Sequence, residues 1–298
     1  MQRPQTIDPI ALRDRLAQHV DVLARVIGDR NLATRYASLE SAARHIESTF
    51  TQLGYQPAAQ IYRVSGRDVR NIEVESPGDG KRDEIIVIGA HYDSVPGCPA
   101  ANDNASGVAG VLELARHFRT ITTSRTLRFV AFVNEEPPYF HSEQMGSLVY
   151  ARRSRKRKEK IAGMISLETI GCYSEEKNSQ EYPALLRTFF AKTGNFIALV
   201  GDRASRRFVR RFAETFRRHS DFPMKAVAAP GFITGIGWSD HWSFSKVGYP
   251  ALMATDTAPF RYRYYHTPHD TPEKINYECM ARVVQGIGAA VNECASGS

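Results

Sequence analysis

The chain has 298 residues, of which 42% are hydrophobic and 24% charged, and its formal net charge at pH 7 is +7. This composition is that of a globular protein with one large or two modest domains, and we expect a single domain, residues 1–298, with N-terminal helices in residues 1–60 packed on its core. The excess basic residues fall in residues 152–158 and 203–218, which read as solvated helix faces, so we expect no nucleic-acid partner.

Other features narrow the class further. No run of about 18 apolar residues is present, so we expect no membrane-spanning helix. Charged residues interrupt the first 25 positions, which excludes an apolar signal sequence there. We therefore expect a cytoplasmic protein, or a periplasmic or secreted one if an export signal has been removed. The four cysteines are scattered, without a Cys-x-x-Cys pair, and we expect free thiols. The sequence leaves the oligomeric state open.

Strand and helix patterns alternate along the chain. Asp8 followed by Pro9 predicts the start of a first helix, whose apolar face continues to Ile27. Further helices are predicted at 38–53, 105–120, 147–157, 182–193, 205–219 and 273–292. Strands are predicted at 71–75, 85–90, 127–133, 161–167, 196–200 and 250–254. This order predicts an α/β fold, a three-layer α/β/α arrangement with a central, mostly parallel mixed sheet.

Two adjacent glutamates, Glu135 and Glu136, follow the apolar strand predicted at 127–133. Two carboxylates placed together at a buried strand end repel each other and lose hydration, so a cation or a proton must offset their charge. Successive side chains on an extended segment point to opposite sides. One carboxylate can therefore bind a metal while its neighbour reaches a water molecule beside it, which favours metal-assisted hydrolysis.

Acidic and histidine side chains follow the other predicted strands as well. His91 and Asp93 come directly after one strand, and Glu168 comes after another. His91 is a plausible metal ligand, and Asp93 is placed to accept a hydrogen bond from its other ring nitrogen. Asp103 opens the helix predicted next, where a carboxylate either caps the helix or bridges two cations. Ligands of such sheets bind beyond the carboxyl ends of the strands, so these side chains predict a metal site there.

With a late histidine, His266, this ordered set resembles the M28 family of zinc aminopeptidases, and the resemblance covers the chain from about residue 71 to the last helix. The motifs that carry it are His91-Tyr92-Asp93-Ser94, Asp103-Asn104-Ala105-Ser106-Gly107, Asn134-Glu135-Glu136, Met145-Gly146-Ser147 and Tyr265-His266-Thr267-Pro268-His269-Asp270-Thr271.

The resemblance implies a metal-dependent exopeptidase that removes N-terminal residues from peptides with two zinc ions. It implies that Asp103 bridges the ions, that His91 and Glu168 complete the ligands of the first, and that Glu136 and His266 complete those of the second. Glu135 would be the general base, and Tyr265 matches a tyrosine that in some relatives hydrogen-bonds the developing oxyanion; a packed aromatic is the equal alternative for Tyr265.

Several positions depart from the family pattern or extend it. The family usually has aspartate where this chain has Glu168, which leaves the occupancy and identity of the first metal open, with manganese or cobalt as alternatives to zinc. The insertion at 137–144 is expected at the substrate rim. The resemblance also implies a cis peptide between Asp103 and Asn104, and a role for Asp240-His241 in orienting loops or ligands.

His141 and His269 are expected near the site or on the surface but not as metal ligands. The residue preference stays open, because each of the aromatic residues near the site either lines an apolar pocket or packs in the core. These are Phe140, Trp238, Trp242, Phe244 and Tyr264.

Two other functions use the same scaffold. A glutaminyl cyclase is an acyltransferase with one zinc, but such cyclases tend to carry tryptophan where this chain has Tyr265. A non-catalytic binding protein is the other alternative, and the filled ligand positions disfavour it. We therefore favour the peptidase.

Overall fold

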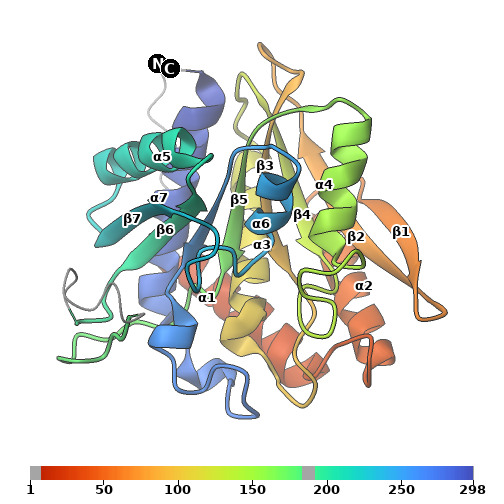
Figure 1. Ribbon diagram of the computed structural model, residues 1–298, viewed down its shortest axis with the longest axis vertical. Coiled ribbons are helices and arrows are strands. Elements are labelled where there is room, and N and C mark those ends of the chain that lie inside the picture. Colours follow the sequence, from red (N-terminus) through yellow and green to blue (C-terminus); the bar gives the residue numbers. More distant parts are fainter. Residues whose placement is uncertain (1–7, 183–191, 298) are drawn as a thin grey trace.

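The computed structural model describes residues 8–182 and 192–297. Within them one eight-stranded sheet has the order β1-β2-β4-β3-β5-β8-β6-β7 (Figure 1). The strands are β1 (Ala58–Val64), β2 (Arg67–Ser76), β3 (Glu84–His91), β4 (Thr126–Phe132), β5 (Lys160–Glu168), β6 (Ile197–Asp202), β7 (Met224–Ala229) and β8 (Ala251–Thr255). The pairs β3/β4, β3/β5, β5/β8 and β6/β7 are parallel, and the other three pairs are antiparallel. The predicted mostly parallel mixed sheet is confirmed.

Helices cover both faces of this sheet (Figure 1). They are α1 (Pro9–Asp21), α2 (Tyr36–Gln52), α3 (Gly107–Phe118), α4 (Gly146–Lys156), α5 (Arg206–His219), α6 (His241–Lys246) and α7 (Tyr277–Ser296). Alternate residues of β3 separate the two faces: Ile86 and Ile88 pack in the large core with α1, α2, α3, α5 and α7, whereas Ile85 and Val87 pack under α4 and α6. This explains the continuous apolar run of β3, because a central strand is buried on both sides.

The helix boundaries follow local side-chain chemistry. Asp8 accepts hydrogen bonds from the amides of Ile10 and Ala11, so α1 begins where the sequence predicts. The regular helix ends at Asp21, and a wider helical turn continues to Ile27. The last helix begins at Tyr277, later than predicted, because the Asn276 side chain caps it after a separate turn. The predicted helix at 182–193 lies largely on 183–191, outside the described residues.

Two strands and one short helix were not predicted. β1 forms a hairpin with β2 through Ser65 and Gly66, which both have positive φ values (49° and 81°), as a two-residue hairpin turn requires. β7 is a partly exposed edge strand that pairs only with β6 in the described part of the sheet. α6 is a short helix of 6 residues near the site.

A buried arginine joins the N-terminal helices to the segment that leads from β3 toward Asp103. Arg30 is 0% exposed, yet its guanidinium has no carboxylate hydrogen-bond partner among the described residues. It donates instead to five main-chain carbonyls, those of Leu23, Gly28, Tyr92, Pro99 and Ala100. A single side chain therefore satisfies buried acceptors of both segments.

Replacing Arg30 by leucine should lower the free energy of unfolding by about 3 kcal/mol or more, because several buried carbonyls lose their donor together. Urea unfolding measures this change. Arg35→Leu is the control, since the Arg35 side chain is 64% exposed and its change should stay within about 0.5 kcal/mol. A loss below about 1 kcal/mol for Arg30→Leu would contradict the role assigned to these bonds.

Candidate metal centre

The carboxyl ends of three adjacent strands bring the acidic and histidine residues together. β3 ends at His91, β5 ends at Glu168, and β4 ends just before Glu135 and Glu136. These strands lie side by side in the order β4-β3-β5, so their ends converge at one edge of the sheet. The clustering that strand order predicts is present.

Asp103 lies at the centre of this cluster. One carboxylate oxygen, Oδ1, is 3.2 Å from His91 Nε2, and the other, Oδ2, is 2.9 Å from His266 Nε2. Glu168 Oε2 lies 3.4 Å from the same nitrogen of His91, and Glu136 Oε2 lies 3.4 Å from that of His266. Two groups of three potential ligands, His91/Asp103/Glu168 and Asp103/Glu136/His266, therefore share Asp103.

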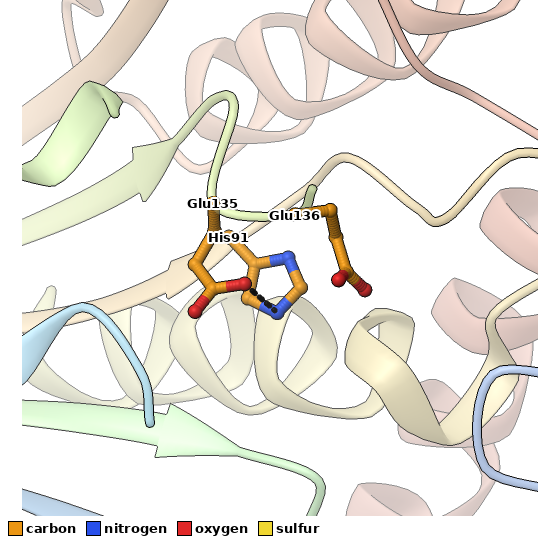
Figure 2. A group of neighbouring side chains, drawn as sticks. All are labelled: His91, Glu135 and Glu136. Carbon is orange, nitrogen blue, oxygen red and sulfur yellow. Dashed lines mark ion pairs between the residues drawn. The ribbon is translucent and has the colours of Figure 1, made fainter. Parts of the chain in front are cut away.

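Glu135 and Glu136 point to different sides of the His91 ring (Figure 2). Glu135 Oε2 lies 3.9 Å from His91 Nε2, the contact drawn in Figure 2. A third combination of potential ligands, His91, Glu135 and Glu136, overlaps the first two. The geometry of the side chains alone thus permits more than one ligand set, and the chemistry of each residue must distinguish them.

The donor set fits divalent metal ions. Histidine nitrogens and carboxylate oxygens are the ligands that zinc takes in hydrolytic sites. His91 Nε2 and Glu136 Oε1 are buried without a hydrogen-bond partner among the described residues. Burial and, after it, the nearby carboxylate of Asp103 raise the pKa of Glu136 to about 8. Burial also raises the pKa of Glu135 well above its usual value, and Glu168 adds to this effect. Bound cations would offset this crowded negative charge.

The side chain of Asp93 binds the backbone amides of the two glutamates. Its two carboxylate oxygens accept hydrogen bonds from the amides of Glu135 and Glu136, both at 3.1 Å. The expected partner, His91 Nδ1, lies 3.6 Å from Asp93 Oδ1, beyond hydrogen-bond distance. These two hydrogen bonds fix the backbone of Glu135 and Glu136, so Asp93 sets the direction in which the two glutamates leave the strand end.

Residues 71–291 match the model of peptidase family M28. The chain belongs to this family. YfbL of Escherichia coli strain K12, an uncharacterized protein, is 37% identical over 284 residues, which cover 92% of this chain and 86% of YfbL. Aminopeptidase YwaD of Bacillus subtilis strain 168 is 28% identical over 232 residues, which cover 74% of this chain but 44% of YwaD.

Solved structures share the fold of this M28 chain at lower identity. An aminopeptidase from Aneurinibacillus sp. strain AM-1 superposes with a TM-score of 0.73 at 18% identity, covering 95% of this chain and 94% of that one. A glutaminyl cyclase from Fimbriiglobus ruber does so with a TM-score of 0.69 at 20% identity, covering 98% and 97%. The family supports a peptide hydrolase and a zinc-type site, while the structural likeness shows the fold.

The segment around Asp103 in this M28 protein is held by residues that sequence reasoning did not assign. Asp270 accepts hydrogen bonds from the amides of Asn102 and Asp103, at 2.9 and 3.1 Å. Asn104 donates to the carbonyl of Leu167, next to Glu168. The peptide between Asp103 and Asn104 is cis, as the family resemblance implies. In the sequence, the one signal for this role of Asp270 was its position four residues after His266, in the same motif.

A serine hydrogen-bonds to Glu168, the glutamate at the position where the family resemblance implies an aspartate. Ser239 donates to Glu168 Oε2 at 2.7 Å, and its oxygen also lies 2.7 Å from that of Ser166 on the same strand as Glu168. Glutamate has one methylene more than aspartate, so the carboxylate of Glu168 has more conformational freedom. This hydrogen bond reduces that freedom. Ser239 belongs to the segment that contains Asp240 and His241, so this segment does contact a candidate ligand.

His241 connects the same segment to the loop at 230–238. Its Nε2 lies 2.7 Å from the carbonyl of Ile236, which makes Nε2–H the donor, and Nδ1 is buried without a hydrogen-bond partner among the described residues. Burial therefore lowers the pKa of His241 from 6.5 to about 4. The predicted role of this segment in orienting a loop agrees with this contact.

The low pKa of His241 predicts a pH dependence of stability. The unfolded chain takes up this proton near pH 6.5, whereas the folded chain takes it up near pH 4, so the free energy of unfolding falls as the pH falls through this window. The loss reaches up to about 3 kcal/mol, at about 1.4 kcal/mol per pKa unit. Urea unfolding at several pH values, compared with His241→Gln, isolates this contribution; equal pH slopes for the two proteins would refute it.

The two further histidines suggested near the site, His141 and His269, lie outside the candidate ligand groups of the described residues. The His141 ring is stacked between those of Phe140 and Trp242, with centroids 4.0 and 3.9 Å away, and its Nε2 lies 2.9 Å from the carbonyl of Gly237. The insertion at 137–144 therefore contacts the loop at 230–238. His269 is exposed.

A pocket opens beside Glu168, and Trp238 is the one member of the five suggested aromatic residues among its described lining. Phe244 is a residue of α6 and is completely buried in the core cluster that α6 and α4 form with the sheet. Cys98 lies near Thr267, but burial raises the pKa of its thiol to about 12, which disfavours a nucleophilic thiolate. The described cysteines are all free.

No helix within residues 8–182 or 192–297 combines the length and apolar character needed to cross a bilayer.

Proposed function

We propose that this protein is an aminopeptidase that hydrolyses the N-terminal residue of peptides with two zinc ions, with manganese or cobalt as substitutes. The position of Asp103, with one carboxylate oxygen toward each of two histidines, is the observation that carries the proposal. His91 and Glu168 would hold one ion with Asp103, and Glu136 and His266 would hold the other. When bound, such ions supply Lewis acidity, which makes hydroxide available at neutral pH and polarises a substrate carbonyl.

Glu135 is the proposed general base. It is left over once the two groups that share Asp103 are assigned, and its carboxylate lies on the His91 side of the cluster. We assign it to take a proton from the attacking water and to deliver that proton to the leaving amine. Its raised pKa favours holding a proton between these two steps, and bound cations would favour its ionised form at the start.

Tyr265 is the proposed donor to the oxyanion. Its ring stacks on that of His266 with a centroid distance of 3.8 Å, and it lines the pocket beside Glu168. Burial raises the pKa of its hydroxyl above the ordinary value, so the hydroxyl keeps its proton at neutral pH and can donate a hydrogen bond.

We also propose that the N-terminal helices belong to the same catalytic domain. Buried residues of α1 and α2 pack in one core cluster with α3, α7 and the strands, and Arg30 bonds to the segment before Asp103. This supports a single domain over the described residues.

Purified protein with added zinc or manganese tests the proposal on aminoacyl p-nitroanilides and on short peptides. We expect release of the N-terminal amino acid, and no release from substrates whose amino terminus is acetylated. Cyclisation of N-terminal glutamine without amino-acid release would favour the glutaminyl cyclase alternative instead. Release from blocked substrates would indicate an endopeptidase.

A further inference from the structure

The floor of the pocket is one row of paired residues across the sheet. Glu168 of β5 pairs with Thr255 of β8, Thr255 pairs with Ala198 of β6, and Ala198 pairs with Lys225 of β7. Paired residues of neighbouring strands point to the same face. At about 4.8 Å per strand, the backbones of Glu168 and Lys225 are about 14 Å apart. Both residues line the pocket, so it runs from the metal cluster to a lysine.

Between these two ends the floor and the walls of the pocket are mostly apolar. Val200 and Met253 form the next row of the floor, under Ile236. Aromatic rings surround this floor, contributed by Tyr182, Phe196, Trp238, Phe260 and Tyr265. Apolar walls lower the local dielectric constant, which strengthens electrostatic interactions at the polar ends of the pocket relative to bulk water.

The far end of the pocket is positively charged. The Lys225 ammonium donates a hydrogen bond to the Tyr182 hydroxyl at 2.8 Å and lies 4.0 Å from the centre of the Phe196 ring. The Arg261 guanidinium lies 4.5 Å from the centre of the same ring. Arg261 is held there by hydrogen bonds to Gln180 and to main-chain carbonyls. Burial, with Arg261 nearby, lowers the pKa of Lys225, which an anion beside the ammonium would counteract.

We propose that Lys225 binds a carboxylate of the substrate peptide at the end of the pocket opposite Glu168. This inference rests on the proposed aminopeptidase function and extends it to a substrate preference. The pocket has the proposed metal cluster at one end of its described lining and an ammonium at the other, which complements a peptide whose reacting amino-terminal end lies at the cluster and whose carboxylate lies away from it.

Two carboxylates of a peptide can supply this group. One is the side chain of an N-terminal glutamate or aspartate, and the other is the C-terminal carboxylate of a short peptide. Their chemistry toward Lys225 is the same, so substrates that carry only one of them distinguish the two sources.

The test compares Lys225→Met, which keeps the length and removes the charge, with wild-type protein and with Lys225→Arg. If the side chain is the source, Lys225→Met lowers the kcat/KM ratio of glutamyl- over leucyl-p-nitroanilide by about tenfold or more, as loss of a charge-assisted hydrogen bond predicts. If the C-terminus is the source, the ratio of leucyl-glycine over leucyl-glycine amide falls by that amount. In either case Lys225→Arg should restore much of the ratio.

Lys81→Met is the matched control, because Lys81 is exposed and precedes β3 at the edge of the sheet opposite the metal cluster. It removes the same charge and should change neither ratio. Ratios in Lys225→Met that equal those of wild type would overturn the inference while leaving the aminopeptidase function intact.

A binding measurement keeps the inference testable if no substrate is hydrolysed, a result that would remove the proposed function. Glutarate is the probe, and calorimetry with the protein as purified gives its affinity. Binding about tenfold weaker in Lys225→Met than in wild type would support a carboxylate site at Lys225, and equal affinities would contradict it.

Discussion

Replacing Glu135 by glutamine should lower kcat for peptide hydrolysis by about 1,000-fold, within the range of about 10²–10⁴ that general acid–base catalysis contributes. Glutamine keeps the size and the hydrogen-bonding oxygen of the side chain but cannot accept and return a proton. The ligands of the two proposed ions are unchanged in this variant. Bound zinc, measured by mass spectrometry of the metal, should therefore equal that of wild type.

The pair of measurements separates Glu135 as a base from Glu135 as a ligand, a role that the overlapping group of His91, Glu135 and Glu136 also permits. Loss of metal in Glu135→Gln would favour the ligand role. Glu143→Gln is the control, because the Glu143 side chain is 67% exposed and pairs with Arg152 outside the cluster. It should retain wild-type kcat and metal content.

The second large effect is expected at Asp103. Asp103→Ala should remove both ions, whereas His91→Ala and His266→Ala should each deplete mainly one, leaving about one ion per chain. Each variant should lose about 1,000-fold or more in kcat/KM, since the ions supply several kcal/mol of transition-state stabilisation. The reason is that Asp103 is the residue common to the two groups of potential ligands.

Metal content after dialysis, together with circular dichroism to verify folding, measures this prediction. His269→Ala is the matched control, because this exposed histidine lies three residues after His266 but outside the candidate ligand groups of the described residues. Two ions retained in Asp103→Ala would contradict the bridging role. Unchanged metal content in both His91→Ala and His266→Ala would refute the ligand assignment as a whole.

The sequence predicted the central sheet and the clustering of the candidate residues for one physical reason. Parallel strands place their carboxyl ends at the same edge, so residues such as His91 and Glu168 converge although 77 positions separate them in the sequence. Strong apolar runs made β3 and β4 visible. The edge strands β1 and β7 were missed, because partly exposed strands with mixed residues lack that pattern.

Other parts of the site depend on pairing that a single sequence does not display. Lys225 and Glu168 lie in one row of paired residues only because β8 lies between β5 and β6 and β6 runs antiparallel to β8. The hydrogen bond from Ser239 to Glu168 joins segments about 70 residues apart, and no local pattern marks it. Asp93 was predicted to accept a hydrogen bond from His91, but His91 Nδ1 lies 3.6 Å away, and the main-chain partners that Asp93 has instead depend on the turn after β4.

Anomalous diffraction at the zinc edge, from crystals grown with zinc, tests the central claim most directly. We predict two peaks about 3.5–4 Å apart, one among His91, Asp103 and Glu168 and one among Asp103, Glu136 and His266, with Asp103 bonded to both. A single peak, or a peak with Glu135 as one of its ligands, would contradict the two-ion site with Glu135 as its base.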